Sequence, residues 1–275
     1  MTDPATVPGT PGATEAVQRA TNDSAWRGGR LVASYANRDL RPVEVVLLVR
    51  YRDRLTERVL ELGCGAGRLT GYLAEIGRSV HGIDLSPEMV AFCRRRYPRA
   101  TFDVGDLRDV AATGRASVDA VIAGFNVLDV LGDEARLAVL DAIHEVLAPG
   151  GLLILSSHNR AVAAKVAHPF ALRGRSLVGL AELLIRYPAW RRNRHRLLPF
   201  ERSEPGYAIL NDSAHDFTLL HYYIDRDAQQ RQLEEHGFDL LECLDLQGGS
   251  VAPGESAAES AELHYVALKR EDPAR

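Results

Sequence analysis

One glycine-rich stretch constrains this chain more than any other feature. The apolar run Val59–Leu62 predicts a buried strand, and glycine then occupies positions 63, 65 and 67. Glycine adopts positive φ readily and lets a ligand approach the backbone, so this spacing predicts a tight turn at a ligand site. The periodic segment Arg68–Glu75 predicts a helix directly after the turn.

Glu61 distinguishes this turn from a dinucleotide site. A dinucleotide fingerprint, G-x-G-x-x-G, places a pyrophosphate at the helix N-terminus, whereas the spacing here is G-x-G-x-G. Glu61 lies two residues before the first glycine, where its carboxylate would repel a diphosphate and attract a cationic ligand. The stretch resembles motif I of the class I S-adenosylmethionine (SAM)-dependent methyltransferases, whose cofactor carries a sulfonium and an ammonium group.

Later segments agree with this resemblance in order and spacing. Ser79–Asp84 predicts a second strand ending in an acid, about twenty residues after the turn, where Rossmann-like units bind ribose hydroxyls. Ala100–Val104 and Val118–Ala123 predict the third and fourth strands, and Leu147–Leu152 resembles the turn that leads into the fifth. The resemblance is strong over residues 59–158.

The resemblance implies a set of residues that hold SAM and its product S-adenosylhomocysteine (SAH). Asp84 would bind the ribose, Asp106 the adenine amino group, and Met89 would lie beside the adenine. Tyr35, on an N-terminal lid helix, would either contact the methionine carboxylate or pack that helix. The full implied set is Tyr35, Glu61, Gly63, Gly65, Asp84, Leu85, Met89, Asp106, Leu107 and Phe125.

The resemblance also implies an α/β fold, and the alternation of predicted strands and helices favours it. The sheet would be Rossmann-like and seven-stranded, parallel except for an antiparallel last strand, with helices on both faces and a cap insertion between strand five and the last helix. The predicted parts are a disordered tail (1–23), an N-terminal helical lid (24–57), a SAM-binding core (58–158), a basic cap (159–224) and the C-terminal part of the core (225–270).

Local signals refine this outline. Asp133 and Asp225 are placed to cap helices, and Pro188 is expected to limit a short apolar helix that starts near residue 176. The segments Tyr207–Leu210 and Phe217–Ile224 predict an antiparallel hairpin over the site.

The insertion is strongly basic. Between residues 158 and 200 the chain has nine arginines and lysines and one acid, Glu182. The cluster Arg191–Arg196 follows Tyr187 and Trp190, and it would meet either an anionic partner or solvent. Arg160, Lys165, Arg173, Arg175 and Arg186 complete the count.

Four residues are candidates for a general base. His158 ends the fifth strand, and His215 and His221 lie on the predicted hairpin. An imidazole titrates near neutrality and suits this role, although the hairpin histidines could instead only pack within the strands. Asp129 follows the fourth strand, where similar small-molecule O-methyltransferases carry a histidine, and it would either act as the base or orient the nearby loop.

We therefore predict a SAM-dependent methyltransferase that transfers a methyl group to a hydroxyl or amine of a small molecule, such as a natural product or sugar. The alternatives are a larger anionic acceptor (a lipid-linked glycan, a membrane-associated substrate or RNA) and a non-catalytic SAM-binding accessory protein. The net charge of −4 disfavours nucleic acid, while peripheral membrane contact stays open. We expect no metal, because no acid pair near Asn126 completes a hard-cation site. Three widely spaced cysteines and no apolar run near twenty residues predict a cytoplasmic protein.

Overall fold

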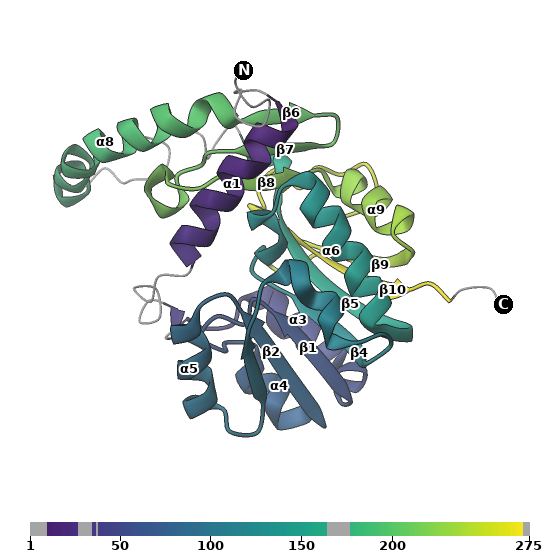
Figure 1. The fold of residues 1–275 in the computed structure, drawn as a ribbon. Helices are drawn as coiled ribbons and strands as arrows, with labels where there is room; N and C mark the ends of the chain where they lie inside the picture. The colour runs from purple at the N-terminus through teal and green to yellow at the C-terminus, as the bar shows by residue number, and fades with distance from the viewer. Residues whose placement is uncertain (1–9, 27–34, 37, 164–176, 272–275) are drawn as a thin grey trace, which may run out of the picture.

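The computed structural model describes residues 10–26, 35–36, 38–163 and 177–271. One sheet organises them, in the order β3-β2-β1-β4-β5-β8-β7-β6, and β10 pairs with both β5 and β9 (Figure 1). The strands are β1 (Arg58–Leu62), β2 (Ser79–Asp84), β3 (Thr101–Val104), β4 (Val118–Ala123), β5 (Leu147–Asn159), β6 (Arg202–Glu204), β7 (Tyr207–Leu210), β8 (His221–Ile224), β9 (Phe238–Leu244) and β10 (Glu262–Lys269). The α-helices are α1 (Pro11–Trp26), α3 (Pro42–Arg50), α4 (Thr70–Ile76), α5 (Pro87–Arg96), α6 (Asp133–Val146), α8 (Leu177–Leu197) and α9 (Arg226–Glu235).

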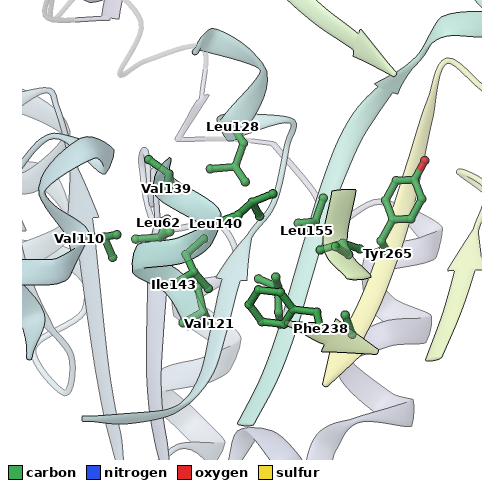
Figure 2. Close-up of a cluster of buried hydrophobic side chains, with 14 of the residues drawn as sticks. Leu62, Val110, Val121, Leu128, Val139, Leu140, Ile143, Leu155, Phe238 and Tyr265 are labelled. Carbon is green, nitrogen blue, oxygen red and sulfur yellow. The ribbon is translucent and has the colours of Figure 1, made fainter. Parts of the chain in front are cut away.

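The predicted seven-stranded core is confirmed. Strands β1 to β5 are parallel, and β10 runs antiparallel to both β5 and β9. The strands alternate between two apolar layers, because successive side chains of a strand point to opposite faces. On β1, Val59 packs with α3 and α4 residues, whereas Leu60 and Leu62 pack with α6 residues. Figure 2 shows Leu62 beside Leu140 and Ile143 of α6. Helices therefore cover both faces of the sheet.

Three further strands from the insertion extend this sheet. On one edge of β5, the pairing with β4 ends at Leu155, and β8 pairs with β5 further along, where Tyr223 lies opposite His158. On the other edge, His158 pairs with Glu262 of β10. The predicted hairpin is confirmed in β7 and β8, whose register pairs residue 210 with 221. Its second strand is shorter than predicted and begins at His221, because residues 215–217 adopt positive φ.

The tail predicted at residues 1–23 is wrong from residue 11 onward, where the chain forms α1. Buried polar side chains attach this helix to distant backbone carbonyls. Gln18 donates to the carbonyls of Leu131 and Leu220, at 3.0 and 3.2 Å. Asn22 donates to the carbonyls of Val130 and Leu220, both at 2.9 Å. Most helices that pack on a domain do so through an apolar face, whereas these hydrogen bonds attach α1. Composition alone therefore did not indicate the helix.

Three local predictions need correction. The residue at the N-cap of α6 is Gly132, and the Glu15 carboxylate of α1 accepts from the free N–H groups of Glu134 and Ala135. Asp225 is the N-cap of α9 by position, but its side chain makes no capping bond and pairs with Arg160 instead. Helix α8 continues through Pro188 to Leu197 rather than ending there.

Candidate functional site

A cavity of about 350 Å³ lies beyond the carboxyl ends of β1, β2 and β4. Ligands of open α/β sheets bind at this edge. Every predicted site residue except Asp129 lines it: Tyr35, Glu61, Gly63, Gly65, Asp84, Leu85, Met89, Asp106, Leu107, Phe125, His158, His215 and His221. Sequence reasoning missed several other lining residues, among them Asp23, Arg41, Arg68, Asn126 and Glu262.

The glycine turn and Asp84 form one hydrogen-bonded unit. Gly63 and Gly65 have φ of 61° and 54°, in the left-handed region that glycine adopts without strain. The Asp84 carboxylate accepts from the Gly65 N–H at 2.8 Å and from the Ser86 N–H at 2.9 Å. Burial raises the pKa of Asp84 despite these two bonds. The backbone therefore fixes this carboxylate at the pocket wall before any ligand arrives.

Glu61 is a buried carboxyl on the floor of the pocket. Its side chain accepts a hydrogen bond from the Thr70 hydroxyl, and the residue is 4% exposed. Burial raises the pKa of Glu61 to about 7, against the opposing effects of Thr70 and Arg68. A cation that enters the pocket would favour the ionised carboxylate.

A cationic and aromatic wall closes one side of the cavity. Arg68 binds the Glu44 carboxylate through both guanidinium nitrogens, and Arg41 pairs with Glu262. The Arg41 guanidinium also lies 4.2 Å from the ring centre of Phe125, whose edge meets Tyr35 at 5.9 Å between centroids. These arginines come from α3's N-terminal flank and from the end of the glycine turn, a grouping that no local pattern indicated.

Another part of the lining carries a second charged group. Asp106 accepts from its neighbour Arg108 at 2.6 Å, and Arg108 also pairs with Asp23 of α1 at 3.3 Å. Met89 is buried next to this wall on the first turn of α5, where Ser86 caps the helix as its sequence position indicates. Helix α1 thus completes the pocket as well as the fold.

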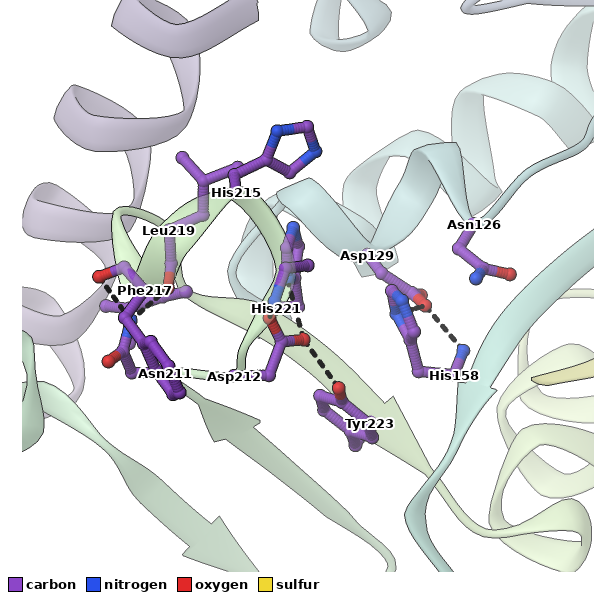
Figure 3. Close-up of polar contacts among 12 residues, drawn as sticks. Asn126, Asp129, His158, Asn211, Asp212, His215, Phe217, Leu219, His221 and Tyr223 are labelled. Carbon is purple, nitrogen blue, oxygen red and sulfur yellow. Dashed lines mark hydrogen bonds and ion pairs between the residues drawn. The ribbon is translucent and has the colours of Figure 1, made fainter. Parts of the chain in front are cut away.

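Two imidazole–carboxylate pairs occupy the remaining wall (Figure 3). Asp129 Oδ2 lies 2.7 Å from His158 Nδ1 and 2.6 Å from the same residue's backbone nitrogen. Asp129 Oδ1 accepts from Arg136 at 2.7 Å and from the Ser157 hydroxyl at 2.5 Å. Burial would raise the pKa of Asp129, but Arg136 and His158 outweigh burial and lower it.

Asp129 is therefore misplaced for the predicted alternative of a base. It is fully buried, lies outside the pocket lining, and both of its oxygens accept hydrogen bonds. Its contacts orient His158, whereas the other half of the prediction had Asp129 orient the nearby loop. Because an ionised carboxylate only accepts, Nδ1 of His158 carries the proton of this bond and Nε2 is left to the pocket.

The second pair comes from the insertion. Asp212 Oδ2 lies 2.9 Å from His221 Nδ1 and accepts from the Tyr223 hydroxyl at 2.5 Å. The ring centroids of His158 and His221 are 5.3 Å apart. His215 stands next to His221, with 6.4 Å between centroids, and its ring meets Trp26 edge-on at 4.9 Å.

The basic segment is partly neutralised by the rest of the chain. Arg160 pairs with Asp225, Arg186 with Asp216, and Arg194 with Glu201 and the carbonyl of Asn211. Arg191, Arg192, His195 and Arg196 line a separate, open surface depression of about 540 Å³ with Tyr187 and Pro188. Lys165, Arg173 and Arg175 lie outside the described residues.

Two negative findings hold for the part of the chain that the structure describes. It contains no group of three or more His, Cys, Asp or Glu side chains that could hold a metal ion. None of the helices drawn there combines the length and apolar character needed to cross a bilayer. The three cysteines are buried and free, and Cys64 lines the pocket within the glycine turn.

Comparison with known proteins identifies a methyltransferase domain in part of the chain. Residues 59–151 match the family model described as a methyltransferase domain. A Mycolicibacterium smegmatis protein named as a probable S-adenosylmethionine-dependent methyltransferase is 35% identical over 130 residues, covering 46% of this chain and 49% of that protein. The ubiquinone biosynthesis O-methyltransferase of Xanthomonas oryzae is 35% identical over 129 residues, covering 46% and 53%. The chain thus spans about half the length of the curated relatives it matches.

Solved structures agree in fold. The 1,6-didemethyltoxoflavin-N1-methyltransferase of Burkholderia thailandensis, with 1,6-didemethyltoxoflavin and SAH bound, has a TM-score of 0.59 at 17% identity over 96% of this chain and 92% of that one. The CcbJ methyltransferase of Streptomyces caelestis has a TM-score of 0.58 at 18% identity, covering 89% and 98%. The fold matches that of the class I SAM-dependent methyltransferases, and residues 59–151 match a methyltransferase domain.

Proposed function

We propose that this protein binds SAM in the 350 Å³ cavity and transfers the methyl group to a hydroxyl or amine of a small molecule, such as a natural product or a sugar. The transfer is an in-line displacement that leaves SAH. The observation that carries the proposal is that one cavity joins the glycine turn and the acids Glu61, Asp84 and Asp106 to three imidazoles. Relatives whose names state O-methylation and N1-methylation support this acceptor range.

The residues present fit the cofactor. Asp84 is held by two backbone N–H groups and offers its carboxylate to ribose hydroxyls, while Glu61 faces the cationic end. Asp106 and Met89 flank the space for the adenine. The Oδ1 atom of Asn126 is a buried acceptor without a hydrogen-bond partner among the described residues, so a polar ligand group in the cavity would satisfy it.

The protein's own contribution to the reaction is positioning and proton removal. When bound, SAM supplies an electrophilic methyl group and a neutral leaving group. The cavity walls orient the acceptor, and such orientation is worth about 7–11 kcal/mol of barrier in well-aligned systems. His158 offers Nε2 to the acceptor's proton, because Asp129 holds Nδ1. Asp129 then stabilises the resulting imidazolium, a positioning role familiar from histidine bases held by carboxylates.

Calorimetry tests the cofactor assignment. Wild-type protein should bind SAH at micromolar levels, and Asp84→Ala should bind about tenfold to a hundredfold more weakly, because the ribose hydroxyls lose a buried partner worth about 1–3 kcal/mol. Asp103→Ala is the matched control, since Asp103 lies one residue before the end of the adjacent strand β3 but its side chain is 68% exposed. Equal SAH affinity in Asp84→Ala and wild type would remove Asp84 from the site.

A second candidate acceptor is a larger anionic molecule. Arg191, Arg192, His195 and Arg196 gather around one depression on α8, which favours contact with phosphate-bearing glycans or anionic lipid. In this case the acceptor group would enter the same cavity while α8 holds the rest of the molecule. SAH binding without turnover on any acceptor would instead support an accessory role.

A further inference from the structure

Two of the three candidate histidines, His158 and His221, lie close together on the wall of the cavity. His158 is the next-to-last residue of β5 and His221 is the first residue of β8; the two strands pair in parallel, with His158 opposite Tyr223. Both rings line the same cavity, and each has its Nδ1 bound to a buried aspartate (Figure 3). Since Nδ1 is occupied in both, each ring presents Nε2 as its remaining polar atom.

The two pairs differ in their surrounding charge. Asp129 binds the guanidinium of Arg136 at 2.7 Å, and both side chains are fully buried. Asp212 contacts His221, the Tyr223 hydroxyl and the Ala214 N–H, and among the described residues it contacts no arginine or lysine. Burying an uncompensated charge is costly, so each cluster favours zero net charge. The Arg136 guanidinium already brings the Asp129 cluster to zero, whereas an ionised Asp212 is balanced by a cationic His221.

We infer that the two histidines have different jobs: His158 removes a proton, and His221 is a cationic anchor for a second oxygen of the acceptor. The centroid separation of 5.3 Å lets two oxygens held close together in one molecule meet both rings. The acceptor class is thus a hydroxyl compound with a carboxylate or similarly electron-rich oxygen next to the reacting oxygen. This inference rests on the proposed function and deepens it.

The groups that face His221 agree with the cationic form. Burial lowers the pKa of His221, but Asp212 and the more distant Asp129 outweigh it, so the pKa stands above its ordinary value. Burial likewise raises the pKa of Asp212, but His221 outweighs it and the pKa of Asp212 is lowered.

The third imidazole remains neutral. Burial, then the positive charge of His221 and of Arg38, lowers the pKa of His215, while Asp212 and Asp216 oppose them. The Tyr223 hydroxyl donates to Asp212 and stays protonated, because burial raises its pKa. The acceptor therefore meets one cationic ring among three imidazoles.

Nitrogen NMR of the histidine rings tests the charge assignment on the full chain with SAH bound. At neutral pH, His221 should carry protons on both ring nitrogens, and His158 should carry a proton on Nδ1 alone. Asp212→Asn should convert His221 to the neutral form and leave the His158 signals in place. The single variants His158→Gln and His221→Gln assign the signals, and circular dichroism checks their folding.

Probe binding tests the acceptor class. Salicylate places a carboxylate beside its hydroxyl, whereas 4-hydroxybenzoate has the same groups at opposite ends of the ring. Salicylate should bind the SAH-loaded protein at least about tenfold more tightly, the scale of one charge-assisted hydrogen bond. His221→Gln should abolish this preference. His236→Gln is the matched control, because its ring contacts Asp141 at 2.5 Å but lies outside the pocket lining.

A neutral His221 in the wild type at neutral pH overturns the inference. Equal binding of the two isomers, or no binding of either, also overturns it. These outcomes are separate from the fate of the proposed function, which depends on SAH binding and its loss in Asp84→Ala. If Asp212→Asn fails to fold, the wild-type spectrum and His221→Gln still decide the question.

Discussion

An ionised Glu61 should lower the free energy of unfolding and raise the affinity for the cofactor. The substitution Glu61→Gln separates these two effects. Burial raises the pKa of Glu61 from 4.5 to about 7. Below the lower value both folded and unfolded chains hold the proton, and stability is unaffected. Between the two values the unfolded chain has released a proton that the folded chain keeps, so the free energy of unfolding falls as pH rises. Above the higher value the loss is complete, at about 3 kcal/mol.

Glu61→Gln should therefore be more stable than the wild type in alkaline solution. The amide keeps an oxygen for the Thr70 hydroxyl but has no proton to lose. Urea unfolding at about pH 5 and about pH 8 should show the variant's advantage growing by roughly 2–3 kcal/mol between the two conditions. Glu75→Gln is the control, since that side chain is 67% exposed and pairs with Arg99 on the surface.

The same substitution should weaken cofactor binding. SAH carries an ammonium group, which favours an ionised Glu61, so wild-type affinity should rise between about pH 6 and about pH 8. Glu61→Gln should bind about tenfold more weakly at the higher pH and lose the pH dependence. A stability difference that is the same at both pH values, together with pH-independent wild-type affinity, would refute the reasoning.

Three further predictions address the turn, the base and the surface. Gly63→Ala should lower stability by more than about 2 kcal/mol and impair SAH binding, because φ is +61° and a Cβ would lie 2.1 Å from a valine methyl; an unchanged urea midpoint would contradict this. His158→Gln should reduce turnover about a hundredfold with SAH affinity intact, and wild-type turnover should fall below neutral pH; a variant with normal turnover and an unchanged pH profile argues for proximity alone. Replacing Arg191 and Arg192 by Glu should leave SAH affinity unchanged and abolish any salt-sensitive binding to anionic vesicles; a wild type that never binds them has only a solvated basic face.

The core could be predicted because its signals are local. The apolar strands, the glycine turn and the acid after β2 follow one another at short separations, and each strand's alternation already specifies two buried faces. Ser86 and Pro87 likewise specify the start of α5 within a few residues. These elements could be predicted because the residues that specify each one lie close together in the sequence.

Helix α1 shows why the rest was missed. Its segment contains Gln18 and Asn22 where a docked helix usually has apolar residues, and their partners are carbonyls more than a hundred residues away. Glu15 caps α6 across the same interface. Hydrogen bonds to partners so far away in the sequence leave no periodic apolar pattern. The sequence therefore predicted a flexible tail where the structure has a helix that lines the pocket.

The histidines show the same division. Their strand ends were predictable, but the aspartates that hold them were not, because Asp212 is nine residues from His221 and Asp129 is 29 from His158. The charge difference between the two pairs depends on Arg136, which comes from α6. The charge of an aspartate–histidine pair depends here on a third buried residue from another helix, so it can be inferred only from the folded structure.

Backbone strain at the two aromatic walls of the cavity supports the view that both walls are functional. Phe125 and Asn126 have φ of 55° and 57°, and residues 215–217 have φ of 49°, 60° and 59°. Non-glycine residues in this region cost about 1–2 kcal/mol each and persist only where surrounding contacts hold them. The Ser156 hydroxyl accepts from the Asn126 N–H at 2.7 Å, and the Trp190 indole donates to Asp216 at 2.7 Å. The fold thus holds two strained turns in place from outside the cavity, and both turns direct rings at the space where cofactor and acceptor would meet.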